Sequence, residues 1–124
     1  MELPPATTPL DRLLAAVVDF ETTGLRAFEG HAVIEVGVVL VDGLDVLDEP
    51  RVSSLVDPRR AVSESSFGVH GISSERLQGQ PRFADVLPEL LRALEGRVMV
   101  AHNATFDASF LRAEMERLDL EPPT

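Results

Sequence analysis

The feature that most constrains the fold is an uninterrupted apolar run that ends in acidic residues. Residues 13–20 read LLAAVVDF, and Glu21 follows. Such a run is typical of a strand buried on both faces, because strands of this kind lie between covering layers. A second run, residues 33–41 (VIEVGVVLV), predicts another strand because it is rich in β-branched residues. The chain is therefore expected to build its core around a sheet.

The next part of the chain supplies a third strand and irregular segments. Asp42-Gly43 is a hairpin signal, and residues 52–56 predict the third strand. Residues 57–72, which include proline and glycine, are expected to form a long loop. A short helix capped by a serine is expected over residues 73–77.

Helices are expected on either side of a fourth strand. Residues 83–94 have a helical apolar pattern, although Pro88 predicts a kink or a restart of the helix. Residues 97–101 predict the fourth strand, and residues 104–118 predict the second helix. Three strands in a row followed by helix, strand and helix indicate an α/β fold with a mixed sheet. The stripe expected to pack on the sheet consists of Ala104, Ala108, Leu111, Met115 and Leu118.

Composition narrows the class of protein. A length of 124 residues suits one domain, expected over residues 13–124 and preceded by a flexible, proline-containing arm over residues 1–12. The formal charge of −10 argues against nucleic-acid binding through a broad basic surface. The absence of cysteine excludes disulfides, thiol catalysis and cysteine-bound metals. We expect no membrane span and no secretory signal, and a cytoplasmic setting fits.

Two acidic residues stand where the first strand ends. Strand side chains alternate between faces, so Asp19 and Glu21 are expected to point the same way, about 7 Å apart. Taken alone, the pair is explained more simply by two solvated acids at a strand end. The alternative is a site for Mg²⁺ or Mn²⁺, which prefer hard oxygen ligands.

A third acid follows the fourth strand, in the segment AHNATFD of residues 101–107. Asn103 is a good N-cap for the helix that follows, and capping alone would explain it. An Asp in the first turn, such as Asp107, would complement the helix dipole. That explanation is weaker for Asp107, because it lies on the side of the helix that is expected to meet the sheet, where a carboxylate needs a cation. His70, before Gly71, would on its own be an ordinary loop histidine.

Three segments together resemble a known family. The motifs DFETTG at residues 19–24, HGI at residues 70–72 and HNATFD at residues 102–107 resemble the DnaQ-like 3′–5′ exonucleases of the DEDD superfamily, in the order and spacing of epsilon-type proofreading domains. The resemblance implies a ribonuclease H-like fold. In that fold the first three strands of a mixed sheet are antiparallel, the fourth is parallel to the first, and helices flank both faces.

The resemblance also implies roles for individual residues. Asp19, Glu21 and Asp107 would be catalytic carboxylates that hold two Mg²⁺ or Mn²⁺ ions. The expected partners are the 3′ end of single-stranded DNA or a nucleoside monophosphate, and a DNA polymerase subunit. The residues implied in substrate binding are Phe20, Thr22, Thr23, Gly24, His70, Gly71, Ile72, His102, Asn103 and Phe106.

One part of the family pattern is missing from the sequence. The family has a further Asp preceded by His or Tyr, whereas the residues after Asp107 include Asp119 but neither His nor Tyr. The resemblance therefore implies a domain that stops before its fifth strand, and we expect the chain alone to be inactive. The alternatives are a non-catalytic module that binds metal and nucleotide, or a scaffold that binds a partner or itself through the edge of the fourth strand. RNA as the substrate stays open.

Overall fold

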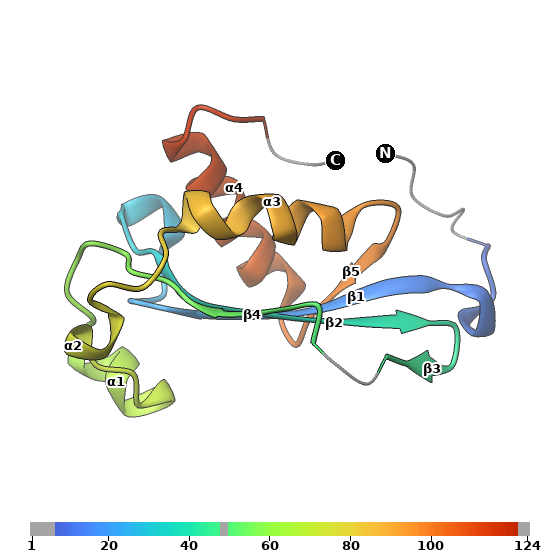
Figure 1. Cartoon of the computed structure of the whole chain (residues 1–124), viewed down its shortest axis with the longest axis horizontal. Helices are drawn as coiled ribbons and strands as arrows, with labels where there is room; N and C mark the ends of the chain where they lie inside the picture. The colour runs from blue at the N-terminus through green and yellow to red at the C-terminus, as the bar shows by residue number, and fades with distance from the viewer. Residues whose placement is uncertain (1–6, 48–49, 122–124) are drawn as a thin grey trace.

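The computed structural model describes residues 7–47 and 50–121, and its centre is one mixed sheet (Figure 1). Half of the predicted arm, residues 1–6, lies outside these residues, and its last part, Leu10–Arg12, forms a single 3₁₀ turn. The five strands are β1 (Leu14–Thr22), β2 (Val33–Asp42), β3 (Asp45–Val46), β4 (Val52–Leu55) and β5 (Val98–Val100).

The strand order confirms the predicted topology. β2 pairs antiparallel with β1 and with β4, whereas β5 pairs parallel with β1. The hairpin signal at Asp42-Gly43 is also confirmed, since Gly43 adopts a left-handed φ of 64° and the chain returns in the short strand β3. β3 itself was not predicted, because two exposed residues leave no apolar pattern.

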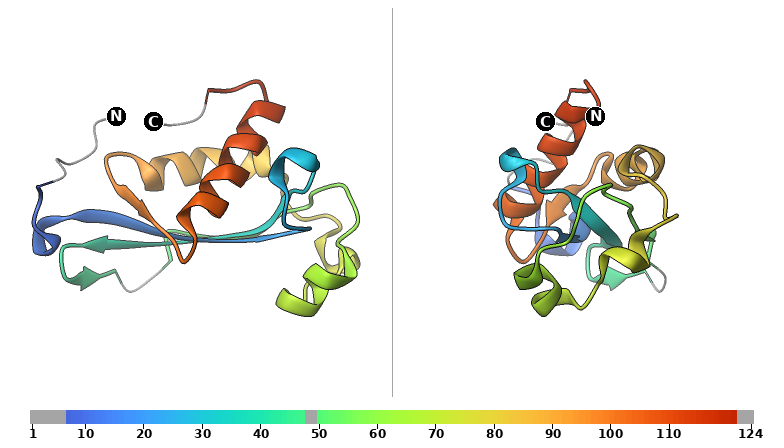
Figure 2. Two further views of the ribbon diagram at one scale, coloured as in Figure 1. Left: turned by 180° about the vertical axis from the view of Figure 1, so that it is seen from behind. Right: turned by 90° about the vertical axis from the view of Figure 1, so that its left-hand side faces the viewer.

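The helices are not distributed evenly over the sheet. Both long helices, α3 (Phe83–Leu94) and α4 (Ala104–Arg117), lie on one face (Figures 1 and 2). The short helices α1 (Glu64–His70) and α2 (Ser74–Leu77) lie at the end of the sheet where β1 finishes. A 3₁₀ turn, Ala27–Glu29, follows β1.

This arrangement corrects the prediction that the first strand is buried on both faces. Val18 and Phe20 are buried under the long helices, but Val17 is 38% exposed and Asp19 is exposed. Within the described residues no helix covers the face on which Val17 and Asp19 lie, although the resemblance implied helices on both faces. The side chains of Asp19 and Glu21 are therefore open to solvent or ligand.

The prediction of a continuous loop over residues 57–72 is wrong. Helix α1 occupies its second half, capped at the start by the hydroxyl of Ser63, which accepts from the Ser66 N–H, and ended by Gly71 in the left-handed conformation. His70 is thus the last residue of a helix. The predicted short helix is confirmed as α2, with Ser73 as its cap.

The two long helices follow their predicted bounds, with one change in the buried stripe. α3 runs unbroken through Pro88, so the expected restart does not occur. In α4 the exposed Ala104 and Leu118 lie outside the core, while Asp107 and Glu114 are buried beside Phe110. The sheet-facing side of α4 therefore carries two carboxylates.

The outer edge of β5 has no paired strand among the described residues, because β5 pairs with β1 alone. Self-association through this edge stays a prediction. In the same part of the chain, no helix has both the length and the apolar character needed to cross a bilayer.

Candidate active site

The site forms where β5 stops short along β1. β5 pairs with residues 15–17 of β1, so the remainder of that edge of β1 is open for the start of α4. Asp107 lies in the first turn of α4 and is 5% exposed, whereas Asp19 on β1 is exposed and Glu21 is partly buried. The topology thus brings residues from the two ends of the chain to one place.

The electrostatics show that the three carboxylates act on one another. The pKa of Asp107 is raised to about 6, first by burial and then by the charges of Asp19 and Glu21, while a hydrogen bond from the backbone of Phe20 opposes the rise. The pKa of Glu21 is also raised, first by burial and then by Asp19, while His70 opposes the shift. Asp107 forms no ion pair in the described part of the chain.

The side chains of Asp19, Glu21 and Asp107 offer carboxylate oxygens to a divalent cation. Carboxylate oxygens alone suit a hard ion such as Mg²⁺ or Mn²⁺. As the side chains stand, no group of three His, Asp or Glu residues within residues 7–47 and 50–121 is close enough to enclose one ion. The kind of donor suits such an ion, and a cation would offset the mutual repulsion of the three acids, but the spacing of the side chains in this structure does not enclose one.

His70 connects helix α1 to the end of β1. Its Nδ1 lies 3.0 Å from the Ile72 N–H, which donates to it, so Nδ1 carries no proton. Its Nε2 lies 3.1 Å from the carbonyl oxygen of Thr22 and must be the donor there. Because both ring nitrogens are engaged, His70 holds the wall of the site in place.

A cleft of about 260 Å³ opens beside the carboxylates. Its lining includes five of the predicted residues, namely Phe20, Glu21, Thr22, His70 and Phe106. It also includes four that sequence reasoning missed: Leu25, Ser65, Ser66 and Val69. Leu25 and Val69 are more than four-fifths exposed. Their positions directly beside the motifs, after Gly24 and before His70, were the available signal.

Several predicted residues lie behind the cleft wall. Thr23 is fully buried, and its hydroxyl oxygen accepts from the Ala32 N–H at 3.0 Å and lies 3.1 Å from Nδ1 of His31. A Cβ at Gly24 would overlap the ring of His31, so any other residue there would force that ring to move. Ile72 is 5% exposed and packs in a small core cluster. These residues support the wall from inside.

The start of α4 contributes an aromatic ring and a cap. The Asn103 side chain accepts from the Phe106 N–H at 3.3 Å and so caps the helix. The ring of Phe106 lies 4.8 Å from that of the buried Phe110, which supports it at the cleft. His102 is exposed in the preceding turn and does not line the cleft, and Gly71 ends helix α1.

The chain is similar in sequence to proteins named DNA polymerase III subunit epsilon and PolC-type DNA polymerase III. It is 38% identical over 104 residues to DNA polymerase III subunit epsilon of Treponema pallidum. The aligned region covers 84% of this chain and 47% of that relative. It is 41% identical over 110 residues to the PolC-type DNA polymerase III of Thermotoga maritima, covering 86% of this chain and 8% of that protein. The chain therefore spans about half the length of the epsilon relative and a small part of the PolC-type one.

Solved structures support the fold. A structure of exonuclease I bound to an inhibitor superposes with a TM-score of 0.78 over 90% of this chain and 25% of that chain, at 15% identity. This likeness confirms the ribonuclease H-like fold class. The sequence model of the exonuclease family matches residues 16–123, which is most of the chain. Fold, motifs and family model agree, and the chain belongs to the exonuclease family.

Proposed function

We propose that this chain carries the metal-binding core of a 3′–5′ exonuclease that hydrolyses single-stranded DNA from its 3′ end. The observation that carries the proposal is the meeting of Asp19, Glu21 and Asp107 at the open edge of β1, with no ion pair to Asp107 in the described residues. Relatives named as DNA polymerase III subunits support DNA as the substrate and a polymerase as the partner. A cytoplasmic setting stays a prediction.

The chain's own residues suit the 3′-terminal nucleotide. Asp19, Glu21 and Asp107 would hold divalent cations, which when bound lower the pKa of a water molecule and offset the charge of the phosphate. The exposed side chains of Leu25 and Val69 and the ring of Phe106 offer apolar contacts for a sugar and a base. The hydroxyl groups of Ser65 and Ser66, on α1, add hydrogen-bonding groups to the lining.

Proton transfer is the weak part of this site. His70 uses both ring nitrogens in hydrogen bonds within the fold, and no His or Tyr follows Asp107 in the sequence. General-base help typically contributes about 10²–10⁴-fold to a rate. We therefore expect the 124 residues by themselves to hydrolyse DNA slowly or not at all.

A metal titration tests the carboxylate site first. Calorimetry with Mn²⁺ should give a binding heat for the unchanged chain that is lost in Asp107→Asn. The control is Glu116→Gln, an exposed acid on the same helix, which should bind Mn²⁺ as the unchanged chain does. Equal heats for Asp107→Asn and the unchanged chain would contradict the site.

An activity assay separates the catalytic reading from the non-catalytic one. A 5′-labelled single strand is incubated with excess protein and Mn²⁺. Slow shortening from the 3′ end, absent in Asp107→Asn and present in Glu116→Gln, would support an exonuclease core. Mn²⁺ binding without any shortening favours the non-catalytic module. If the protein shortens an RNA strand in preference to a DNA strand, the assignment of DNA as the substrate is wrong.

A further inference from the structure

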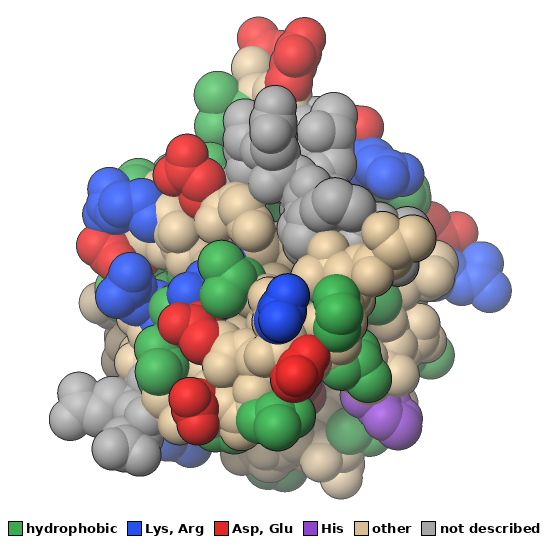
Figure 3. Space-filling view, turned by 90° about the vertical axis from the view of Figure 1, so that its right-hand side faces the viewer, with side chains coloured by type: hydrophobic (Ala, Val, Ile, Leu, Met, Phe, Trp, Pro, Cys, Tyr) green, Lys and Arg blue, Asp and Glu red, His purple; other side chains and the backbone are tan. Residues whose placement is uncertain are grey.

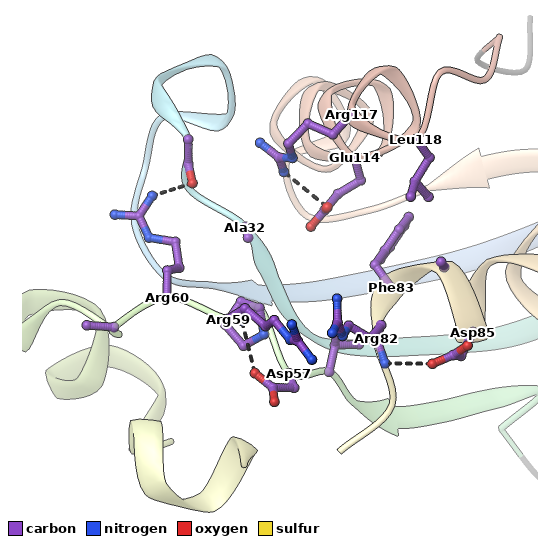
Figure 4. Close-up of a pocket in the computed structure, with 15 residues that line it drawn as sticks. Ala32, Asp57, Arg59, Arg60, Arg82, Phe83, Asp85, Glu114, Arg117 and Leu118 are labelled. Carbon is purple, nitrogen blue, oxygen red and sulfur yellow. Dashed lines mark hydrogen bonds and ion pairs between the residues drawn. The ribbon is translucent and has the colours of Figure 1, made fainter. Parts of the chain in front are cut away.

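A second and larger cavity lies away from the carboxylates, among residues that the proposed exonuclease does not use. Its volume is about 600 Å³, within the range of small-molecule sites. It is bounded by the start of α3, the segment after β4, the residues before β2 and the last turns of α4 (Figure 4). This cavity is therefore separate from the proposed exonuclease site.

Basic side chains are concentrated around this cavity. The chain carries a net charge of −10, and all 11 of its basic residues are arginines. Four of them, Arg59, Arg60, Arg82 and Arg117, line the one cavity. At the opposite end of the molecule, by contrast, acidic, basic and apolar side chains are interspersed (Figure 3). Three acids, Asp57, Asp85 and Glu114, line it as well, so the cavity carries a small excess of positive charge in an acidic protein.

Two of the four guanidinium groups are already engaged. Arg117 lies 3.1 Å from the carboxylate of Glu114 and donates to the carbonyl of His31, and Arg60 donates to the carbonyl of Gly30. The guanidinium groups of Arg59 and Arg82, by contrast, form no hydrogen bond or ion pair within the described ranges. They extend toward each other in Figure 4.

The nearby acids Asp57 and Asp85 form no ion pair with either guanidinium group in the described part of the chain. Asp57 accepts from the backbone N–H of Arg59 at 2.9 Å, and Asp85 accepts from the backbone N–H of Arg82 at 3.0 Å. The Asp57 bond helps to hold Arg59 in a left-handed conformation, with φ 54°, that is unusual for a residue other than glycine. These bonds fix the backbone on both sides of the cavity. The guanidinium groups of Arg59 and Arg82 are left to donate hydrogen bonds to a ligand.

The remaining lining is mostly small and apolar. Phe83 is 6% exposed and Val56 is fully buried, and together they form a closed apolar floor. Such a floor offers no hydrogen bonds, so it suits a flat or compact apolar group attached to the anion.

We propose that this cavity binds a phosphate monoester carried on an apolar or aromatic group, with Arg59 and Arg82 as the anion-binding pair. A phosphate monoester carries between one and two negative charges at neutral pH and matches the planar fork of arginine. Two unengaged guanidinium groups from two segments correspond to that charge. Arg60 and Arg117 add positive charge at the edge of the cavity while they keep their contacts with Gly30, His31 and Glu114.

The test uses the whole chain, with deoxyadenosine monophosphate as the probe and EDTA present so that no metal ion assists binding at the carboxylates. We expect shifts of backbone amide NMR signals at Arg59, Arg82 and Ala84. Deoxyadenosine without its phosphate should not bind measurably, and inorganic phosphate should bind at least about tenfold more weakly than the nucleotide. If inorganic phosphate binds as tightly as the nucleotide, the apolar part of the proposal is wrong.

The double variant Arg59→Gln with Arg82→Gln should weaken nucleotide binding by about tenfold or more, because it removes two charged donors. The matched control, Arg51→Gln with Arg112→Gln, removes the same charge from exposed positions outside the cavity and should change binding less than about twofold. Unchanged binding in the first variant, or shifts at Thr22 and Phe106 in place of the cavity, would overturn the proposal.

Discussion

Helix α4 carries two buried carboxylates, and they are in opposite situations. Asp107 in its first turn is 5% exposed and Glu114 two turns later is 8% exposed. Glu114 accepts from the Val33 N–H at 2.9 Å and lies 3.1 Å from the guanidinium of Arg117. Asp107 instead faces two further acids.

This difference separates a structural acid from a functional one on a single helix. The charge of Glu114 is compensated by the fold itself, so its carboxylate joins α4 to the start of β2. The charge of Asp107 is opposed by its surroundings, and the fold keeps it there at a cost in stability. Burial alone would have classed the two residues together.

The largest effect is expected from removing the compensated acid. Glu114→Ala leaves the buried Val33 N–H without an acceptor and Arg117 without its partner, and should lower the free energy of unfolding by about 3 kcal/mol. Urea denaturation measures this change. Glu116→Ala, on the exposed side of α4, should change it by less than about 0.5 kcal/mol. Comparable losses in the two variants would erase the contrast.

Asp107→Asn should act in the opposite direction. The pKa of Asp107 is about 6 in the fold against 3.8 as its ordinary value, so the folded protein holds this proton more tightly than the unfolded chain. The free energy of unfolding therefore falls as pH rises from about 4 to about 6. In EDTA at pH 7.5 the variant should be more stable than the unchanged chain, by on the order of 1–2 kcal/mol.

At pH 4 the same pair of proteins should be nearly equal in stability, because Asp107 is then protonated in the fold. Denaturation at both pH values provides the comparison. The two proteins should have nearly the same free energy of unfolding at pH 4. If Asp107→Asn is then less stable than the unchanged chain at pH 7.5, the fold does compensate the charge of Asp107.

Proton and metal compete for Asp107, which gives a third prediction. Mn²⁺ affinity should decrease by up to about tenfold for each pH unit below about 6. Calorimetry at pH 5 and pH 7.5 measures this change. A constant affinity would mean that the ion binds without Asp107.

A local effect is expected at the wall of the cleft. His70→Ala removes the hydrogen bonds to the Thr22 carbonyl and the Ile72 N–H, and should lower the free energy of unfolding by about 1–2 kcal/mol. Hydrogen exchange at the Ile72 amide should accelerate at the same time. Val69→Ala, at an exposed neighbouring position, serves as the control. An unchanged hydrogen-exchange rate at the Ile72 amide would show that His70 does not support the wall of the cleft.

Much of the sheet could be predicted from the sequence, because long β-branched runs allow few other structures. The bounds expected for β2 and α3 differ from the structure by at most one residue. The resemblance carried by the motifs also implied that Asp19, Glu21 and Asp107 lie near one another. The parallel pairing of β5 with β1 explains why Asp107, far away in the sequence, lies near the other two acids.

The errors have physical causes. Helix α1 was missed because Ser65, Ser66 and Gly68 give it no apolar stripe, although the Ser63 cap and Gly71 were readable signals. The stripe of α4 was misplaced because hydrophobicity alone cannot predict a buried carboxylate such as Glu114, whose partner is a backbone N–H on β2. The second cavity depends on side chains from distant segments and has no local pattern.

The parallel contact between β1 and β5 also has a consequence for the order of folding. β1, β2 and β4 follow one another in sequence and can associate through short loops, whereas Ala15 meets Val98 from the far end of the chain. Closing so long a loop costs conformational entropy before any contact repays it, so this pairing is expected late. Asp19 and Glu21 belong to the early part, and Asp107 arrives with α4. The carboxylates therefore meet only when the chain is almost completely folded, and a partly folded chain would lack a metal site.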